Sequence, residues 1–185
     1  MGYTLNSAEW HFEQILKIIG EDVNRDGLRE TPKRYIKFIK DFFQPKEFNF
    51  TTFDAEGIDE MIIQANIPFY SLCEHHIIPF FGFATVGYIP NSKIIGLSKL
   101  ARTVDLYADR FQNQERITTQ IAERLWQELS PKGVGVSLTA QHLCMSMRGV
   151  KKNNIWTTTN KLVGIFKELE KVRIEFFSHI KEKRD

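Results

Sequence analysis

One segment, Ser71 to Phe80, limits what this chain can fold into more than any other part of it. Its sequence, S-L-C-E-H-H-I-I-P-F, places a thiol, a carboxylate and two imidazoles at four consecutive positions between apolar residues. Cys73 and His76 have the C-x-x-H spacing with which a tight turn directs a sulfur and a nitrogen at one metal ion, and zinc accepts both donors. Because two ligands do not complete a site, the fold must bring at least one more to this turn.

Few other residues qualify as ligands. The only other cysteine is Cys144, within Q-H-L-C-M, and the other histidines are His11, His142 and His179. We expect Cys144 to be the third ligand. On a strand, His142 and Cys144 would point to the same face, so an imidazole would lie beside the metal. Three protein ligands leave a fourth position open for water, as in catalytic zinc sites, whereas a fourth ligand from His75 or His142 would make the site structural.

Each half of this pattern also has an ordinary explanation. A single C-x-x-H is usually accidental, and a single buried cysteine usually behaves as a small apolar residue. Here, however, each of the two cysteines has a histidine two positions away, and this coincidence favours a metal site.

The composition describes an ordinary globular chain. Its 185 residues suit one domain, and we expect residues 1–185 to form it, with an N-terminal helical segment over 1–60 and a core over 61–185. The net charge of +2 gives no reason to expect a nucleic-acid or membrane surface. With no N-terminal apolar segment and no apolar run near about 20 residues, we expect a cytoplasmic protein whose thiols stay reduced.

Helical periodicity predicts four helical regions. The first covers Ser7 to Ile19, and the second starts at Thr31-Pro32 with Thr31 as its cap. The third is a long stretch from Gly96, with Ser98 as its cap, that bends over Arg110 to Arg116 and resumes to Leu129. The last runs from Leu169 to Ile180 and is followed by a solvated tail, K-E-K-R-D. His179 should lie on the surface of the last helix. We expect a loop from Gln44 to Asp59.

Strand-like segments occupy the middle of the chain and part of its second half. They are Ile67 to Leu72, Phe80 to Pro90, the alternating run from Val134 to Cys144, and a Thr-rich run from Ile155 to Phe166. Strands in hairpin order with helices grouped apart predict an α+β fold.

Two helix starts carry groups that suit a nucleotide. Ser98, Lys99 and Arg102 place a hydroxyl and two cations at a helix N-terminus, where free N–H groups favour phosphate, although a capped helix with solvated charges is an equal explanation. Gln114 and Glu115 either begin a helix or hold the donor edge of a guanine, since a carboxylate accepts two parallel N–H bonds. By itself, Arg34 is best explained as a solvated surface arginine.

Seven motifs in a fixed order resemble the zinc-dependent GTP cyclohydrolase I family. The resemblance runs from about Gly27 to Phe166 and rests on G-L-R-E-T-P-K-R, C-E-H-H-I-I-P-F-F-G, Y-I-P, G-L-S-K-L-A-R, R-F-Q-N-Q-E-R-I-T, H-L-C-M and M-R-G-V. It implies a tunnelling fold, in which antiparallel sheets of several subunits close into a barrel with helices outside. It also implies a homo-oligomer, usually a decamer of two pentameric rings with sites between subunits.

The resemblance assigns roles to individual residues. One zinc ion per subunit would be bound by Cys73, His76 and Cys144, and His75 and His142 would transfer protons. The triphosphate of GTP would be bound by Ser98, Lys99, Arg102 and Arg148, together with Arg34 of a neighbouring chain. The guanine would be bound by Gln114 and Glu115. Ser98 would also take part in the later rearrangement.

The reaction implied is hydrolysis at C8 of GTP and rearrangement to 7,8-dihydroneopterin triphosphate and formate, the first step of pterin and folate-type biosynthesis. Two alternatives stay open: a relative of the same fold acting on another purine or pterin, and a non-catalytic oligomer stabilised by zinc. Thr139 and Trp156 depart from the usual residues of the family, and the sequence leaves open whether a regulatory protein binds.

Overall fold

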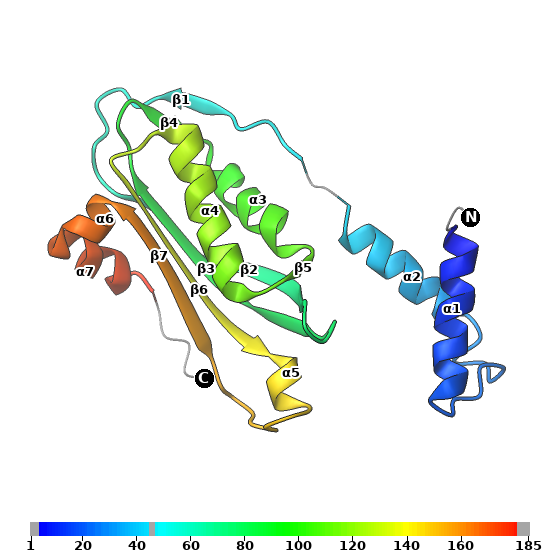
Figure 1. Cartoon of the computed structure of the whole chain (residues 1–185). Helices are drawn as coiled ribbons and strands as arrows, with labels where there is room; N and C mark the ends of the chain where they lie inside the picture. Colours follow the sequence, from blue (N-terminus) through cyan, green and yellow to red (C-terminus); the bar gives the residue numbers. More distant parts are fainter. Residues whose placement is uncertain (1–3, 45–46, 181–185) are drawn as a thin grey trace. The chain divides into compact units, whose positions relative to one another are not determined.

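The computed structural model describes residues 4–44 and 47–180, which divide into two compact units, Met1–Gln44 and Pro45–Asp185 (Figure 1). The unit boundary follows the second helix directly. The organisation expected from the sequence, one domain with a helical segment over 1–60, stays a prediction. The expected tail K-E-K-R-D lies outside the described residues.

The first unit is a pair of helices, α1 (Leu5–Ile18) and α2 (Thr31–Phe42). A capping box between Thr4 and Ser7 starts α1. The N-cap of α2 is Glu30, so the expectation that Thr31 caps this helix was wrong: Thr31 already has helical geometry, and its hydroxyl donates to the Gly27 carbonyl. Of the described residues of this unit, only Pro32 is buried, so a two-helix pair of this length cannot bury a core of its own.

The second unit is built on a five-stranded sheet with the order β5-β2-β3-β6-β7. Its strands are β2 (Ile62–Cys73), β3 (Pro79–Ile89), β5 (Phe111–Gln112), β6 (Gly133–His142) and β7 (Thr157–Gly164). Neighbouring strands are antiparallel, as expected, except at the edge strand β5, which runs parallel to β2, so the sheet is mixed and the expectation of an antiparallel sheet was wrong at this edge. Together with the helices on it, this sheet confirms the predicted α+β fold.

A small second sheet pairs β1 (Thr52–Asp54) with β4 (Lys93–Ile95). The expected loop over residues 44–59 was therefore wrong at Thr52–Asp54. Three residues are too few for an alternating pattern to be recognised, and the pairing partner is distant in the sequence.

Two helices, α3 (Leu97–Ala108) and α4 (Gln114–Leu129), cover one face of the large sheet (Figure 1). Their buried sides meet the side chains of β3 and β6 that point to this face, and these residues form the main core: Leu100, Val104, Ile117, Ile121, Leu125, Val86, Tyr88, Val134, Val136 and Leu138. The predicted bend between the two helices is the short strand β5 and the cap Asn113. The N-cap of α3 is Gly96 without a side-chain bond, so the expectation that Ser98 caps this helix was wrong.

Shorter helices complete the unit: α5 (Leu143–Ser146), α6 (Ile165–Glu168) and α7 (Glu170–Ser178). Phe166 and Phe176 form a smaller core on the opposite face of the sheet, with ring centroids 5.5 Å apart. Gly135 makes this packing possible, because a Cβ there would lie 2.6 Å from the Phe166 ring. His179 is exposed, as predicted, but it is the C-cap that follows α7 and does not lie on the helix itself.

Candidate metal and substrate site

The three predicted metal ligands lie together at one end of the large sheet. Cys73 ends β2, and the segment 73–78, here called the metal turn, leads into β3. The register of β3 with β6 pairs Phe80 with His142, which places the metal turn and the start of α5 side by side. The ligand atoms of Cys73, His76 and Cys144 all lie within 4.8 Å of one another. Two segments far apart in the sequence thus supply one cluster.

Cys144 reaches the cluster from a helix, so the expectation that a strand continues to this residue was wrong. The strand β6 ends at His142, and Cys144 is the second residue of α5. The backbone changes direction at His142 because α5 starts there, so the two side chains do not share a strand face. Their proximity to the metal turn comes instead from the end of β6 and the turn of helix that follows.

The metal turn is tightly hydrogen-bonded. The amides of His76 and Ile77 donate to the Cys73 carbonyl at 3.1 and 2.8 Å. Ile77 has a φ of 56°, which is rare for a β-branched residue and indicates that the surrounding bonds impose the conformation. The Cys73 sulfur lies 3.6 Å from Nδ1 of His75 and 3.6 Å from Nδ1 of His76.

The donor set fits a zinc ion. Two sulfurs and one imidazole nitrogen are ligands that zinc accepts, and tetrahedral ligands at about 2.3 Å are about 3.8 Å apart, close to the separations found here. Burial raises the pKa of the Cys144 thiol, and the neighbouring Cys73 sulfur raises it further. A bound cation would reverse this effect, since a coordinating thiol loses its proton.

His142 is held from two sides. Its ring stacks on the buried Phe80 ring, with centroids 4.6 Å apart and an angle of 4°. Its Nε2 lies 2.8 Å from Oε1 of Gln114, whose amide nitrogen donates to the carbonyls of Leu138 and Thr157, both at 2.9 Å. Because that nitrogen is fully used, Oε1 accepts and the neutral imidazole carries its hydrogen on Nε2, as inferred from this network. Burial lowers the pKa of His142, partly offset by the nearby Glu115 carboxylate.

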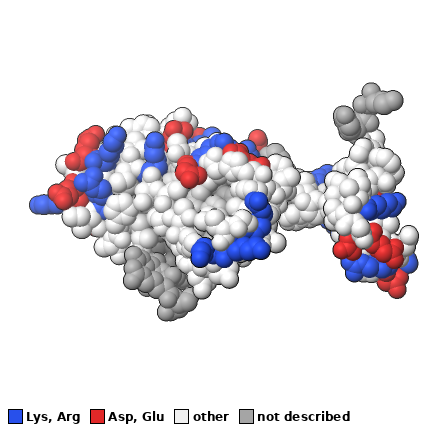
Figure 2. Space-filling model, turned by 60° about the horizontal axis from the view of Figure 1, so that its bottom comes forward, with Lys and Arg blue, Asp and Glu red and all other residues white. Residues whose placement is uncertain are grey.

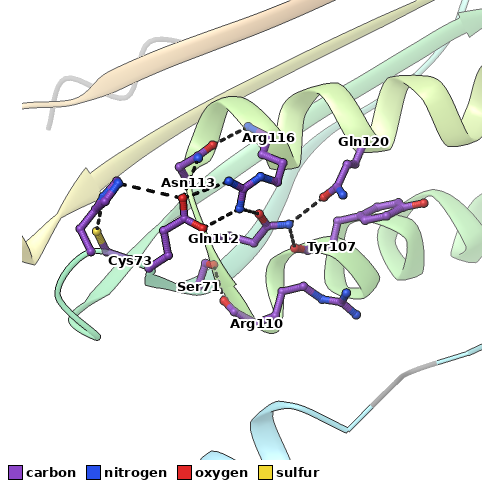
Figure 3. A network of polar contacts seen from close by, with 10 residues as sticks. Ser71, Cys73, Tyr107, Arg110, Gln112, Asn113, Arg116 and Gln120 are labelled. Carbon is purple, nitrogen blue, oxygen red and sulfur yellow. Dashed lines mark hydrogen bonds and ion pairs between the residues drawn. The ribbon is translucent and has the colours of Figure 1, made fainter.

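A polar network that the sequence analysis missed joins the metal turn to the start of α4 (Figure 3). The Glu74 carboxylate accepts two N–H bonds from Arg116, at 2.6 and 3.0 Å, and one from Asn113 at 3.0 Å. The bonds from Arg116 hold the pKa of the Glu74 carboxyl below its usual range. The available signal was a carboxylate inside the ligand motif and an arginine just after Glu115, although nothing in the sequence pairs them.

The predicted phosphate-binding residues of the second unit are on its surface. Ser98 and Arg102 are exposed on α3, and Arg148 is exposed between α5 and β7. Lys99 is partly buried, with Nζ 5.6 Å from the centre of the Phe48 ring. Since α3 packs against β2, the strand that ends in Cys73, Ser98, Lys99 and Arg102 lie on an element in contact with that strand. Arg148 instead follows α5, the helix that carries Cys144.

Three more predicted residues lie in the first turns of helices. Glu115 is exposed in the first turn of α4, beside the buried Gln114, and both residues begin this helix. Arg34 is exposed in the first turn of α2, in the first unit. On the face drawn in Figure 2, Lys and Arg form several separate groups, some beside acidic side chains and some without them.

The two departures from the family pattern lie next to each other. Thr139 and Trp156 line one small hollow together with Ser137 of β6, and the Thr139 hydroxyl is 3.0 Å from that of Thr158. Neither residue belongs to the cluster of metal ligands.

Comparison with known proteins gives concordant matches. The family model described as GTP cyclohydrolase I matches residues 8–181. A GTP cyclohydrolase 1 of Sulfurihydrogenibium sp. (strain YO3AOP1) is 51% identical over 176 residues, covering 95% of this chain and 94% of the relative. One of Coxiella burnetii (strain Dugway 5J108-111) is 46% identical over 183 residues, covering 96% and 99%.

Among solved structures, the archaeosine synthase QueF-Like in its apo form is similar, with a TM-score of 0.47 and 15% identity over 56% of this chain and 93% of that one.

Proposed function

The chain belongs to the GTP cyclohydrolase I family, and we propose that it carries out the reaction of that family at the cluster of Cys73, His76 and Cys144. This activity converts GTP to 7,8-dihydroneopterin triphosphate and formate, within folate-type biosynthesis. One observation carries the placement of the site: three ligand atoms from two distant segments meet within 4.8 Å, beside a histidine held by stacking and a hydrogen bond.

The metal we propose is zinc, one ion per subunit. When bound, zinc lowers the pKa of a water to about 7 and so supplies hydroxide at neutral pH. The roles that follow belong to the side chains around it.

His142 acts as the general acid and base. Its Nε2 hydrogen is bonded to Gln114, so Nδ1 is the atom that exchanges a proton with N7 of the purine. Burial favours the neutral ring and makes its conjugate acid, which carries the Nδ1 proton, a stronger proton donor. Hydration at C8 opens the imidazole ring to a formamide, and a second water releases formate, with His75 as a further proton carrier. The ribose then rearranges, and closure onto the new amine releases one water, a step in which Ser98 takes part.

The remaining residues orient the substrate. The Glu115 carboxylate accepts the N–H groups of the guanine edge, and the adjacent Gln114 supports this contact through its backbone, since its side chain is bonded to His142. The triphosphate is bound by a hydroxyl and four cations: Ser98, Lys99, Arg102, Arg148 and, from a neighbouring chain, Arg34. Such positioning contributes several kcal/mol to catalysis when the reacting atoms are held at contact distance.

We also propose that the sites form in a homo-oligomer, a decamer of two pentamers. Support comes from the first unit, where Trp10 is 56% exposed and Ile18 is 83% exposed, an apolar surface that a second copy would cover. Sedimentation analysis tests this proposal, and a monomer at working concentration would contradict it. No helix in residues 4–44 and 47–180 is long and apolar enough to cross a membrane, and a cytoplasmic location stays a prediction.

A second function has one observation in its favour. Nδ1 of His75 is as close to the Cys73 sulfur as Nδ1 of His76, at 3.6 Å, so a fourth ligand that would close a structural site is available beside the cluster, although the cluster of atoms within 4.8 Å of one another does not include His75. Metal removal and restoration distinguish the two functions.

The test is purified protein with GTP, before and after chelation, with formate and the oxidised fluorescent pterin followed together. Loss of both products on chelation and recovery on adding zinc would support the catalytic site. Formate without pterin would place the block after ring opening and direct attention to Ser98. Neither product from a zinc-loaded oligomer would favour the structural site.

A further inference from the structure

Arg116 has no part in the proposed chemistry, yet its guanidinium binds the metal turn. One of its nitrogens lies 2.6 Å from Oε2 of Glu74 and the other 3.0 Å from Oε1. Two parallel N–H bonds to one carboxylate fix the direction of the contact as well as its length. The contact joins residues 42 positions apart in the sequence.

Glu74 is the residue through which the metal turn can be held. It follows the ligand Cys73 directly and precedes His75 and His76. Its backbone N–H donates to the Gln112 carbonyl at 3.0 Å, and its carboxylate also accepts from Asn113. Both the main chain and the side chain of Glu74 are therefore bonded to residues 112–116.

Arg116 is itself oriented by a buried amide. It donates a third bond to Oε1 of Gln112 at 3.2 Å, and Gln112 is only 2% exposed. The Gln112 nitrogen donates to the Tyr107 carbonyl at 3.1 Å and to the Gln120 side chain at 2.7 Å, so its oxygen is directed at Arg116 (Figure 3). The guanidinium is thus held in place even though its side chain is 46% exposed.

The first turn of α4 supports the site on two sides. Asn113 and Arg116 hold the metal turn, while Gln114, between them in sequence, holds His142. Glu115, the proposed guanine ligand, lies in the same turn. The positions of the metal turn, of His142 and of Glu115 therefore all depend on residues 113–116.

The sizes of the effects on folding stability and on reaction rate distinguish a stabilising role from a positioning one. A partly exposed ion pair such as this adds little to folding stability, so stability alone gives no reason for three bonds on one carboxylate. A displacement of about 1 Å in a reacting group, by contrast, lowers a rate by about a hundredfold.

We propose that Arg116 is a positioning residue that, with Glu74 and Asn113, holds the metal turn in a fixed place against the first turn of α4. The inference rests on the proposed function, because it concerns the alignment of the same site. It assigns Arg116 a larger effect on turnover than on substrate binding or stability.

The experiment compares Arg116→Met, Arg116→Lys, Glu74→Gln and the double variant Glu74→Gln/Arg116→Met with wild type. The matched control is Glu128→Gln, which removes the ion pair with Arg124 from the same helix. Three quantities are measured: kcat and KM for GTP with zinc-loaded protein, zinc affinity by competition with a chromophoric chelator, and the midpoint of thermal unfolding.

For Arg116→Met we expect kcat to fall about 10- to 100-fold and zinc affinity about tenfold, as for other residues that orient metal ligands, with KM changed less than about threefold. Arg116→Lys should recover only part of kcat, since it keeps the charge but not the two parallel bonds. The double variant should be no slower than the slower single variant, because both changes remove one contact. The control should match wild type in kcat and zinc affinity.

Other results would overturn the inference. If wild type is active and Arg116→Met keeps kcat and zinc affinity within twofold, Arg116 has no positioning role, and the proposed function still stands. Losses that merely follow a lower unfolding midpoint, or that also occur in the control, would make the role structural. If zinc-loaded wild type makes neither product, the proposed function fails, and the chelator competition still decides whether Arg116 holds the metal turn. Should Arg116→Met not fold, Arg116→Lys and Glu74→Gln supply the same comparison.

Discussion

The helices α3 and α4 both begin with predicted substrate-binding residues, but they begin in different ways. The start of α4 is capped by Asn113, whose side chain accepts the Arg116 amide at 2.8 Å, and a buried glutamine follows. The start of α3 has Gly96 as its cap, no side-chain bond to the cap, and exposed Ser98 and Arg102.

The two helix starts are proposed to have different roles. The start of α4 supports His142 and the metal turn, whereas the start of α3 binds the triphosphate. Atoms that react must be held within a fraction of an ångström, which requires side chains fixed by their neighbours, as at α4. A triphosphate is a diffuse charge that long cationic side chains can reach from several positions, so the start of α3 needs no such network. Substitutions of Gln114 and Arg116 at the start of α4 should therefore affect turnover, whereas those of Lys99 and Arg102 at the start of α3 should affect substrate affinity.

The largest effect is expected for His142→Ala. Loss of a general acid lowers kcat by about 10²- to 10⁴-fold, while KM and zinc content should change little. His179→Ala, which removes an exposed histidine, is the control. Steady-state kinetics with a zinc assay measure both, and release of zinc with unfolding would instead indicate that His142 closes a structural site.

Gln114→Leu should come next. The change leaves the carbonyls of Leu138 and Thr157 without this donor and His142 without its acceptor; the bond to Leu138 is buried and the other two are partly buried. One such unsatisfied group costs about 1–3 kcal/mol, so both stability and kcat should fall. Denaturant unfolding and kinetics are compared with Gln127→Leu, an exposed glutamine of the same helix, and an unchanged kcat would remove Gln114 from the support of His142.

At the start of α3, Lys99→Met and Arg102→Met should each raise KM for GTP about tenfold, or about 1.4 kcal/mol, with kcat nearly constant. The effect should shrink as salt rises, since screening weakens contacts between exposed charges. Lys93→Met, in the neighbouring strand β4, serves as the control. A fall in kcat without a change in KM would contradict the division between the two helices.

The smallest effect concerns the caps themselves. Asn113→Ala should lower the free energy of unfolding by about 1 kcal/mol, the usual cost of losing an N-cap. Ser98→Ala should leave it unchanged, because Ser98 is not the cap of α3. Chemical denaturation of both variants measures the difference, and equal losses would show that the two helix starts are held alike.

Much of the fold followed from local patterns. The α+β class, the alternation along β6 and the apolar stripes of α3 and α4 were predicted because each depends on residues close together in the sequence. The strands β1 and β4 were missed, and the caps of α2 and α3 were placed wrongly by one or two residues, because such short features carry little periodic signal.

For the site, the spacing of Cys73 and His76 and the neighbourhood of Cys144 predicted the ligands. The backbone argument for Cys144 was wrong, since this residue lies in α5. The cluster still forms, because the pairing of Phe80 with His142 brings the two segments to one end of the sheet.

The sequence by itself determined which side chains are available for chemistry, because ligand type and spacing are properties of short segments. Only the tertiary structure decided which groups support them. The bonds of Arg116 to Glu74 and of Gln114 to His142 span 42 and 28 positions. Contacts of that range depend on strand register and helix packing, and these are settled only when the whole core is buried.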